Sequence, residues 1–424
     1  MIKVDSPAQH LAPVWARYTE IVAERGEGAY LYGRDGHRYL DFTCGIGVTN
    51  TGHCHPRVVA AAQQQLGKLI HGQINIVYHQ PLLDLVEALL PEVPPALDTF
   101  FFSNSGAEAV EASMKLARAA TGREVVICFQ GSFHGRTTGA LAITNSKARY
   151  RLHGGPMPGA VQVSSYPYCL RCSRRGNEGC CQQELADLRE LLATRVPPEM
   201  VAAIMVEPVL GEGGYVVPPA WFMPALRRLC TEHGMMLIAD EVQTGFGRTG
   251  KMFAVEHTET IPDIMVMAKG LASGLPLSGI VAPREIMRHW TPGSHGGTYG
   301  ANAVACAAAT ATVKVIREEG LLENANRRGA SLMAGLRAMQ AEGLGIADVR
   351  GLGLMIAVEF SRPDGSPDGT RGKRILHECL DRGMLVLTCG PYDNVIRLIP
   401  PLIIGEEQVG EALSVLRASI EATA

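Results

Sequence analysis

Two stretches of the chain decide its fold: IMVMAKG at residues 264–270 and MMLIADEVQ at residues 235–243. Each is a short apolar run followed by an ionisable residue, which is Lys269 in the first stretch and Asp240 in the second. Apolar runs without polar alternation are typical of strands buried on both faces of a parallel sheet. Because ligands bind at the carboxyl ends of such strands, we predict that both side chains face one site.

The surrounding sequence repeats this pattern. Between residues 61 and 320, apolar runs alternate with amphipathic helical patterns, which predicts an α/β fold with helices on both faces of the sheet. The further predicted strands are residues 99–102, 124–129, 201–206 and 278–281. The predicted helices are residues 81–90, 107–120, 181–192, 218–233 and 301–317.

The two ends of the chain have patterns of their own. The N-terminal part predicts irregular structure with one hairpin, and the C-terminal part predicts a second α/β unit. The elements predicted in these ends are strands 29–32, 38–41, 353–360 and 395–398 and helices 321–340 and 405–422. We therefore expect a large domain of residues 61–320 and a smaller α/β domain built from residues 1–60 and 321–424.

The composition excludes several classes of protein. The 424 residues carry 39 lysines and arginines against 42 aspartates and glutamates, a formal net charge of −3. A nucleic-acid-binding protein is therefore not expected. No apolar segment reaches the roughly 18 residues of a membrane span, and the first residues lack the pattern of a signal peptide. With 11 cysteines, such a chain indicates reduced thiols and a cytoplasmic protein.

Side chains with chemical potential follow other predicted strands as well. Glu207 follows one of them, and the segment with Phe133, His134 and Arg136 follows another. A partly desolvated lysine at a strand end would have a lowered pKa and a free amine able to attack a carbonyl, although most lysines are simply solvated. A carboxylate such as Asp240 could keep a pyridine nitrogen protonated, as an electron-sink cofactor requires, or could cap a turn.

The stretch FFSNSGAEA, residues 101–109, runs from a predicted strand through a turn of small residues into a helix. Ser105, Gly106 and Ala107 would lie at the N-terminus of that helix, where free N–H groups and the helix dipole bind phosphate. Ser105 and Glu108 also have the spacing of a capping box. The sequence leaves both interpretations open.

Two further motifs carry weaker signals. The stretch GFGRTG at residues 245–250 fits a dinucleotide fingerprint, but it lies away from its strand and no helix follows, so we interpret it as a glycine-rich loop. Cys169, Cys172, Cys180 and Cys181 lie in a polar insertion. They could bind a metal, remain loop thiols or form a local disulfide. No metal ligand is assigned.

Five short motifs occur in one order along the chain: SGA at 105–107, FHGR at 133–136, DEVQ at 240–243, AKG at 268–270 and GGTYG at 296–300. Together they resemble the class III aminotransferases, pyridoxal phosphate enzymes of fold type I. The resemblance covers most of the chain. It implies a mostly parallel, seven-stranded sheet with a smaller α/β domain, and a homodimer or tetramer with active sites at the dimer interface.

The resemblance also implies roles for individual residues. Lys269 would hold the cofactor covalently and then move the 1,3-proton, so Lys269 and Asp240 are the expected catalytic residues. Asp240 would pair with the pyridinium nitrogen, and Gln243 would contact the phenolic oxygen. The other expected cofactor-binding residues are Phe133 on the pyridine face with His134 beside it, Ser105, Gly106 and Ala107 at the phosphate, and Thr298 at the phosphate of the neighbouring subunit.

Substrate recognition is expected at four positions. Arg397 matches the arginine of this family that binds the substrate carboxylate, and a planar guanidinium suits such bidentate contacts. Glu207 resembles the glutamate that pairs with this arginine when no α-carboxylate is present. Arg136 matches the arginine that holds the distal carboxylate in 4-aminobutyrate aminotransferases, unless it is a surface arginine. Ile46 matches an apolar residue of the same pocket.

The expected function is transfer of an amino group from an ω-amino acid, such as 4-aminobutyrate, or an amine to a 2-oxo acid such as 2-oxoglutarate or pyruvate. Two enzymatic alternatives stay open: an (S)-selective amine:pyruvate transaminase, and a racemase or epimerase on the same scaffold. A non-catalytic cofactor-binding protein is disfavoured because Lys269, Asp240 and Gln243 are all present.

Overall fold

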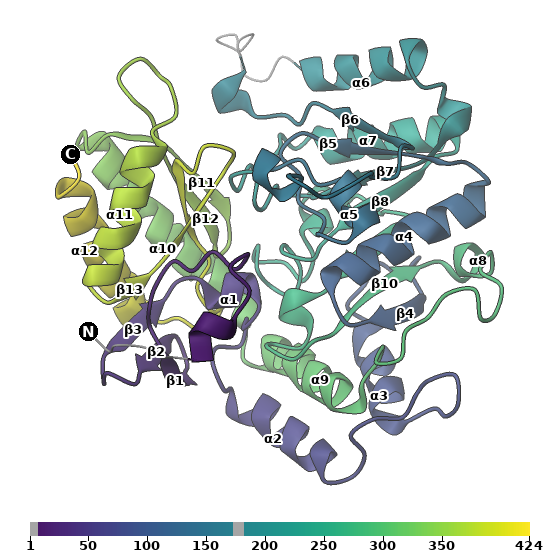
Figure 1. Cartoon of the computed structure of the whole chain (residues 1–424), viewed down its shortest axis with the longest axis horizontal. Helices are drawn as coiled ribbons and strands as arrows, with labels where there is room; N and C mark the ends of the chain where they lie inside the picture. Colours follow the sequence, from purple (N-terminus) through teal and green to yellow (C-terminus); the bar gives the residue numbers. More distant parts are fainter. Residues whose placement is uncertain (1–6, 173–181) are drawn as a thin grey trace.

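The larger part of the molecule is built on one sheet in the computed structural model, which describes residues 7–172 and 182–424 (Figure 1). Its strands are β4 (Thr99–Ser103), β5 (Val125–Phe129), β6 (Val161–Ser164), β7 (Val201–Val206), β8 (Met236–Asp240), β9 (Ile264–Met267) and β10 (Ser278–Ala282). The order is β4-β10-β9-β8-β7-β5-β6. β10 is antiparallel to both of its neighbours, and the pairs from β9 to β6 are parallel. The predicted mostly parallel, seven-stranded sheet is confirmed.

The central strands are apolar throughout because both faces of the sheet are covered. In β5, Val125, Ile127 and Phe129 belong to one hydrophobic core and Val126 and Cys128 to another. The helix α4 (Gly106–Thr121) packs on the second face, and α7 (Phe222–His233) adds its apolar side to the first. The period of two along each strand therefore separates two cores.

The remaining strands form two four-stranded sheets at the other side of the molecule (Figure 1). One contains β1 (Ala23–Glu27), β2 (Tyr30–Gly33), β3 (Arg38–Asp41) and β13 (Met384–Leu385), and the other contains β11 (Ile346–Leu352), β12 (Met355–Phe360), β15 (Val395–Leu398) and β14 (Leu387–Cys389). The predicted hairpin is present as β2 and β3. β13 pairs in parallel with β3, so both ends of the chain share one sheet. The domain boundaries at 60 and 320 stay a prediction, which this pairing favours.

The other helices cover these sheets and connect them (Figure 1). They are α2 (Pro56–Leu66), α3 (Gln80–Leu89), α5 (Thr138–Ala142), α6 (Gln183–Thr194), α8 (Arg284–Met287), α9 (Ala303–Glu318), α10 (Leu321–Ala341), α11 (Gly369–Asp381) and α12 (Glu406–Glu421). α2 and α3 both pack on α9, and α12 packs on α10 and α11. Within the described ranges, every helix is too short or too polar to cross a bilayer.

Several element boundaries differ from the predicted ones for local reasons. α7 begins at Phe222 rather than at 218, because the consecutive prolines Pro218 and Pro219 force extended backbone before it. α9 begins at Ala303 because the side chain of Asn302 accepts the N–H groups that cap it. The predicted helix start at residue 181 lies outside the described residues, and α6 begins at Gln183.

A left-handed turn precedes the large sheet along the chain. It is α1 (Cys44–Gly47), in which φ is 51°, 60°, 66° and 74° at the four successive residues. Such backbone costs about 1–2 kcal/mol at each residue that is not glycine, and glycine supplies two of the four positions. Strain of this kind clusters at functional sites, and the turn carries Ile46 to the site described next.

Candidate active site

One cavity of about 1140 Å³ lies where the parallel strands end. Five of its lining residues come from these ends: Asn104 after β4, Phe133 after β5, Glu207 after β7, Asp240 at the end of β8 and Lys269 after β9. The structure thus brings Lys269, Asp240 and Glu207 to one site, as the carboxyl-end rule predicts for a parallel sheet. Arg397 of β15 closes the cavity from the opposite sheet.

Lys269 lies partly buried in the cavity wall with a strained, positive φ of 44°. Burial lowers its pKa to about 8, although the charges of Asp240 and Glu207 act in the opposite direction. A lysine of this kind holds a substantial fraction of neutral amine near neutral pH. It therefore has the nucleophile needed to attack an aldehyde.

This electrostatic balance predicts the effect of replacing Asp240 by asparagine. Because the carboxylate raises the pKa of Lys269, D240N should move that pKa further below 8. The measurement is the pH dependence of amine labelling at Lys269 in the apoenzyme, followed by peptide mass spectrometry. A labelling midpoint that stays in place or rises in D240N would contradict this electrostatic coupling.

Asp240 is held by the histidine that was expected beside the cofactor ring. His134 Nδ1 lies 2.7 Å from Asp240 Oδ2, and the N–H of Val242 donates to Asp240 Oδ1 at 3.0 Å. Burial alone would lower the pKa of His134, but its hydrogen bond to Asp240 and the charge of Asp240 outweigh it and raise the pKa. His134 therefore lies next to the carboxylate and orients it, while Asp240 and His134 are 3% exposed each.

The N-terminus of α4 forms one edge of the cavity. Gly106 and Ala107 line it, and Asn104 lies just before them. Ser105 is exposed and is absent from the lining: its side chain accepts the N–H of Glu108, whose carboxylate accepts the N–H of Ser105 at 2.7 Å. The capping box is therefore present, and the phosphate role of this turn stays a prediction.

Of two other predicted cofactor-binding residues, Gln243 lies in the cavity and Thr298 does not. Gln243 lines the cavity, and its buried Oε1 has no hydrogen-bond partner within the described part of the chain. Since an unsatisfied buried polar atom is costly, this oxygen is available to a polar group bound in the cavity. Thr298 is exposed and lies outside the residues that line the cavity, so its predicted role at a phosphate stays a prediction.

The predicted pairing of Glu207 with Arg397 is wrong. Arg397 Nη1 instead donates to Glu212 Oε2 at 2.8 Å. The carboxylate of Glu207 is occupied by the backbone N–H groups of Phe133 and Gly211, both at 2.8 Å, so it fixes two loops. Burial raises the pKa of Glu207 to about 7, which also makes it a weaker partner for a guanidinium.

Glu212 is the partner of Arg397 that the sequence did not reveal. Its other oxygen, Oε1, lies 3.2 Å from Lys147 Nζ and accepts the hydroxyl of Tyr150 at 2.8 Å. Burial alone would raise the pKa of Glu212, but the charges of Arg397 and Lys147 outweigh it and hold the pKa below its ordinary value. The sequence signal was limited to the glycines that follow Glu212, which let its loop turn back.

Arg136 and Ile46 both line the cavity and are exposed. The guanidinium of Arg136 stands over the rings of Phe133 and Tyr150, 5.4 and 4.9 Å from their centroids. Within residues 7–172 and 182–424 it forms no ion pair with a carboxylate. Ile46 is 44% exposed. A segment around Trp15 and Tyr18 also lines the cavity, which sequence reasoning missed.

The cysteine motif is only partly described, because Cys180 and Cys181 lie outside the described residues. Cys169 begins a short 3-10 turn that ends at Arg171. In the two described ranges, no group of His, Cys, Asp and Glu side chains has the arrangement of a metal site. The glycine-rich stretch 245–250 forms consecutive turns, as expected for a loop.

Comparison with known proteins gives one consistent family. The family model "Aminotransferase class-III" matches residues 11–420. The chain is 42% identical over 399 residues to 5-aminovalerate aminotransferase DavT of Pseudomonas aeruginosa and 42% identical over 402 residues to 4-aminobutyrate aminotransferase GabT of Escherichia coli, in both cases covering 93% of this chain and 92% of the relative. A PLP-bound amine transaminase from an uncultivated Pseudomonas species has 31% identity and a TM-score of 0.89, with 96% of each chain covered.

The fold and the site together thus define a pyridoxal phosphate enzyme of fold type I. The chain belongs to the class III aminotransferases. Pyridoxal phosphate is its cofactor. The residues of the cavity fit this group: an amine with a lowered pKa at Lys269, a buried carboxylate at Asp240, the unpartnered Oε1 of Gln243, and a helix N-terminus at Gly106.

Proposed function

We propose that this aminotransferase takes its amino group from an ω-amino acid of the 4-aminobutyrate or 5-aminovalerate type and passes it to a 2-oxo acid such as 2-oxoglutarate. One observation carries the proposal. Three arginines line the cavity: Arg397 is neutralised by Glu212, Arg149 lies over the ring of Tyr150, and Arg136 is the one beside Phe133 at the end of β5, with no carboxylate partner in the described part of the chain. An ω-amino acid has one distal carboxylate for Arg136 and leaves Arg397 covered.

Arg136 and Arg397 explain how one site can serve both half-reactions. A donor without an α-carboxylate needs Arg397 neutralised, which the ion pair with Glu212 provides. A 2-oxo acid brings its own carboxylate for Arg397, and Glu212 then keeps Lys147 and Tyr150 as partners. A planar guanidinium suits either carboxylate. The same pocket can therefore accept two unlike substrates in turn.

The cofactor, when bound, delocalises the electron pair that the substrate carbon is left with after losing its proton. The residues of the chain do the rest. We assign Lys269 Nζ to covalent attachment and to moving the proton, since its pKa of about 8 allows both forms. Asp240, oriented by His134, would hold a proton on the ring nitrogen. Phe133 would stack on the ring, with Gln243 at its phenolic oxygen.

We also propose a homodimer in the cytoplasm. Ile70, Ile76 and Tyr78 are 61–80% exposed, and Tyr299 is 65% exposed with its ring 5.5 Å from that of His71. An apolar patch of this kind typically marks a protein interface. It adjoins Thr298, which we assign to the partner's phosphate. The molar mass in solution distinguishes a dimer from a tetramer, and the cysteine content favours a reducing compartment.

The test of the proposed function is a donor panel. Each donor is mixed with the purified enzyme, and loss of the cofactor's absorbance band is followed without an acceptor. We expect 4-aminobutyrate and 5-aminovalerate to give higher kcat/KM than ornithine, acetylornithine or 1-phenylethylamine, and 2-oxoglutarate to restore the band. A preference for 1-phenylethylamine with pyruvate would assign an amine transaminase instead. Loss of chirality without a 2-oxo acid would assign a racemase.

A further inference from the structure

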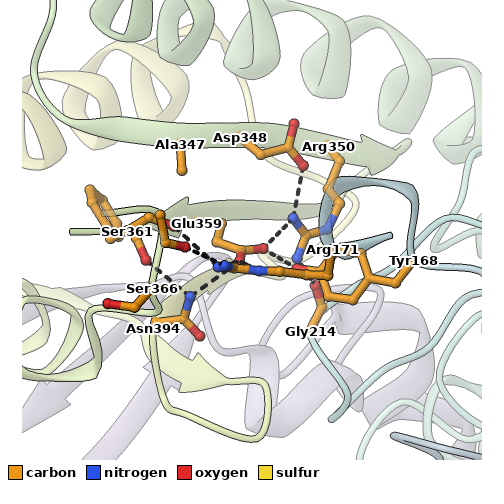
Figure 2. A network of polar contacts seen from close by, with 12 residues as sticks. Tyr168, Arg171, Gly214, Ala347, Asp348, Arg350, Glu359, Ser361, Ser366 and Asn394 are labelled. Carbon is orange, nitrogen blue, oxygen red and sulfur yellow. Dashed lines mark hydrogen bonds and ion pairs between the residues drawn. The ribbon is translucent and has the colours of Figure 1, made fainter. Parts of the chain in front are cut away.

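A cluster of buried charges lies outside the cavity and is centred on Glu359 of β12 (Figure 2). The side chain of Glu359 is 2% exposed. Its carboxylate accepts hydrogen bonds from Tyr168, Arg171, Arg350 and Asn394. Nothing in the proposed chemistry uses this cluster. One of its arginines, however, also contacts the loop that carries Glu212 into the cavity.

That arginine is Arg350 of β11, which lies beside Asp348 and Glu359 in Figure 2. Each of its three guanidinium nitrogens donates a hydrogen bond. Nη1 donates to Asp348 at 2.8 Å and to Glu359 at 2.7 Å. Nη2 donates to the carbonyl of Gly214 at 2.5 Å, and Nε donates to that of Tyr215 at 3.2 Å. The planar guanidinium of Arg350 thus pairs with two carboxylates on one side and donates to two consecutive backbone carbonyls on the other.

These carbonyls belong to the loop that carries Glu212. An isolated bridge between Leu210 and Val216 closes the loop, and the N–H of Gly214 donates to the carbonyl of Gly211 at 3.1 Å. The carbonyl of Glu212 accepts the N–H of Gly390 at 2.8 Å. Gly214 lies only two positions beyond Glu212, so a shift of its backbone moves the Glu212 carboxylate.

Sheet register places Arg350 and Arg397 in one row. Arg350 of β11 pairs with Ala357 of β12, which pairs in turn with Arg397 of β15. Residues that face each other across antiparallel strands lie on the same face of the sheet. Two arginines on one face, separated by one strand, therefore meet the same loop: Arg397 takes the carboxylate of Glu212, and Arg350 takes the backbone beyond it.

We propose that Arg350 is a positioning residue for substrate selection: its hydrogen bonds to the Gly214 and Tyr215 carbonyls hold the Glu212 carboxylate in its ion pair with Arg397. The inference rests on the proposed function, in which this ion pair must be closed for an ω-amino acid and open for an α-carboxylate. Loss of these hydrogen bonds destabilises the ion pair between Glu212 and Arg397, so a substrate carboxylate competes for Arg397 more easily. The effect is a change of preference rather than a general loss of rate.

The test is R350K, which keeps a positive charge beside Glu359 but lacks the fork that reaches two carbonyls. The readout is the ratio of kcat/KM for 4-aminobutyrate to kcat/KM for glutamate as donor. We expect this ratio to fall about 5-fold or more, the lower end of ordinary coupling between sites. The matched control is R171K, which alters the same Glu359 cluster without touching the loop and should leave the ratio unchanged.

A double-mutant cycle separates a positioning effect from a structural one. If Arg350 acts through Glu212, R350K should change the ratio little further once E212Q is present. An unchanged ratio in R350K, an equal fall in R171K, or a full additional fall in the E212Q background each overturns the inference. A wild-type enzyme with no activity on ω-amino acids would refute the proposed function instead.

A second variant serves if R350K does not fold. A Cβ at Gly214 would lie 3.4 Å from Arg350 Nη2, and φ there is +123°, so G214A disturbs the same contact from the loop. We expect the donor ratio to fall in G214A as well. An active G214A with the wild-type ratio would overturn the proposal.

Discussion

Replacing Lys269 by alanine is expected to lower kcat by more than about 10⁴-fold, because it removes both the covalent attachment and a proton transfer that alone contributes about 10²–10⁴-fold. Folding should survive, since the change removes an amine whose charged form is already disfavoured by burial. Steady-state rates with 4-aminobutyrate and 2-oxoglutarate measure the loss. Circular dichroism and the thermal midpoint check the fold.

Lys251 provides a matched control for this prediction. It is an exposed lysine in the glycine-rich loop and is absent from the cavity lining. K251A should therefore keep wild-type turnover. Turnover within about 10-fold of wild type in a folded K269A would mean that another amine performs the chemistry.

Replacing Arg136 by methionine is expected to lower kcat/KM for 4-aminobutyrate and 5-aminovalerate by about 10²–10³-fold. Arg136 is exposed in the free enzyme, and the size is that of a pair covered by the bound substrate, for which loss of one partner typically costs about 2–5 kcal/mol. Methionine keeps apolar contact with Phe133 and Tyr150, whose rings lie under the guanidinium. The measurement is the same donor panel, with 1-phenylethylamine as the donor that lacks a carboxylate.

Two controls make the Arg136 prediction specific. The rate with 1-phenylethylamine should change little in R136M, because this donor offers nothing for a guanidinium. R151M alters an arginine of the same segment that bonds Asn145 and does not line the cavity, and it should leave the panel unchanged. Equal losses for 4-aminobutyrate and 1-phenylethylamine would show that Arg136 supports the structure of the site rather than reading a carboxylate.

The part of the site that sequence predicted well lies at strand ends. Lys269, Asp240 and Glu207 each follow a run that is apolar on both faces, and a parallel sheet necessarily collects such ends at one edge. Gln243 and Phe133 were predicted as site residues from motifs in the loops that follow two of these strands. Their positions in the cavity agree with the prediction, although their contacts with the cofactor stay proposals.

The partner of Arg397 could not be predicted in this way. Glu207 and Glu212 are both acidic, both near one strand, and only the fold of the intervening loop decides which one meets Arg397. The backbone bridge between Leu210 and Val216 brings Glu212 back to the cavity. Such a loop is determined by tertiary contacts, including those of Arg350, and leaves no periodic pattern.

Missed strands and helices share a physical reason too. β6 lies at the edge of the large sheet and is only partly buried, so its sequence VQVS lacks the apolar run of its neighbours. β11 and α11 carry many charged residues, among them Arg350, whose partners come from distant parts of the chain. Trp15 and Tyr18 line the cavity through contacts with residues distant in sequence, which a local pattern does not reveal.

The most direct test asks where the cofactor is attached. The purified holoenzyme is reduced with borohydride, digested and analysed by peptide mass spectrometry, with D240N treated in parallel. We expect the mass of a reduced pyridoxal phosphate adduct on Lys269, in wild type and D240N alike. An adduct on another lysine, or none on Lys269 in an enzyme that turns over, would contradict the assignment of Lys269 as the residue that holds the cofactor.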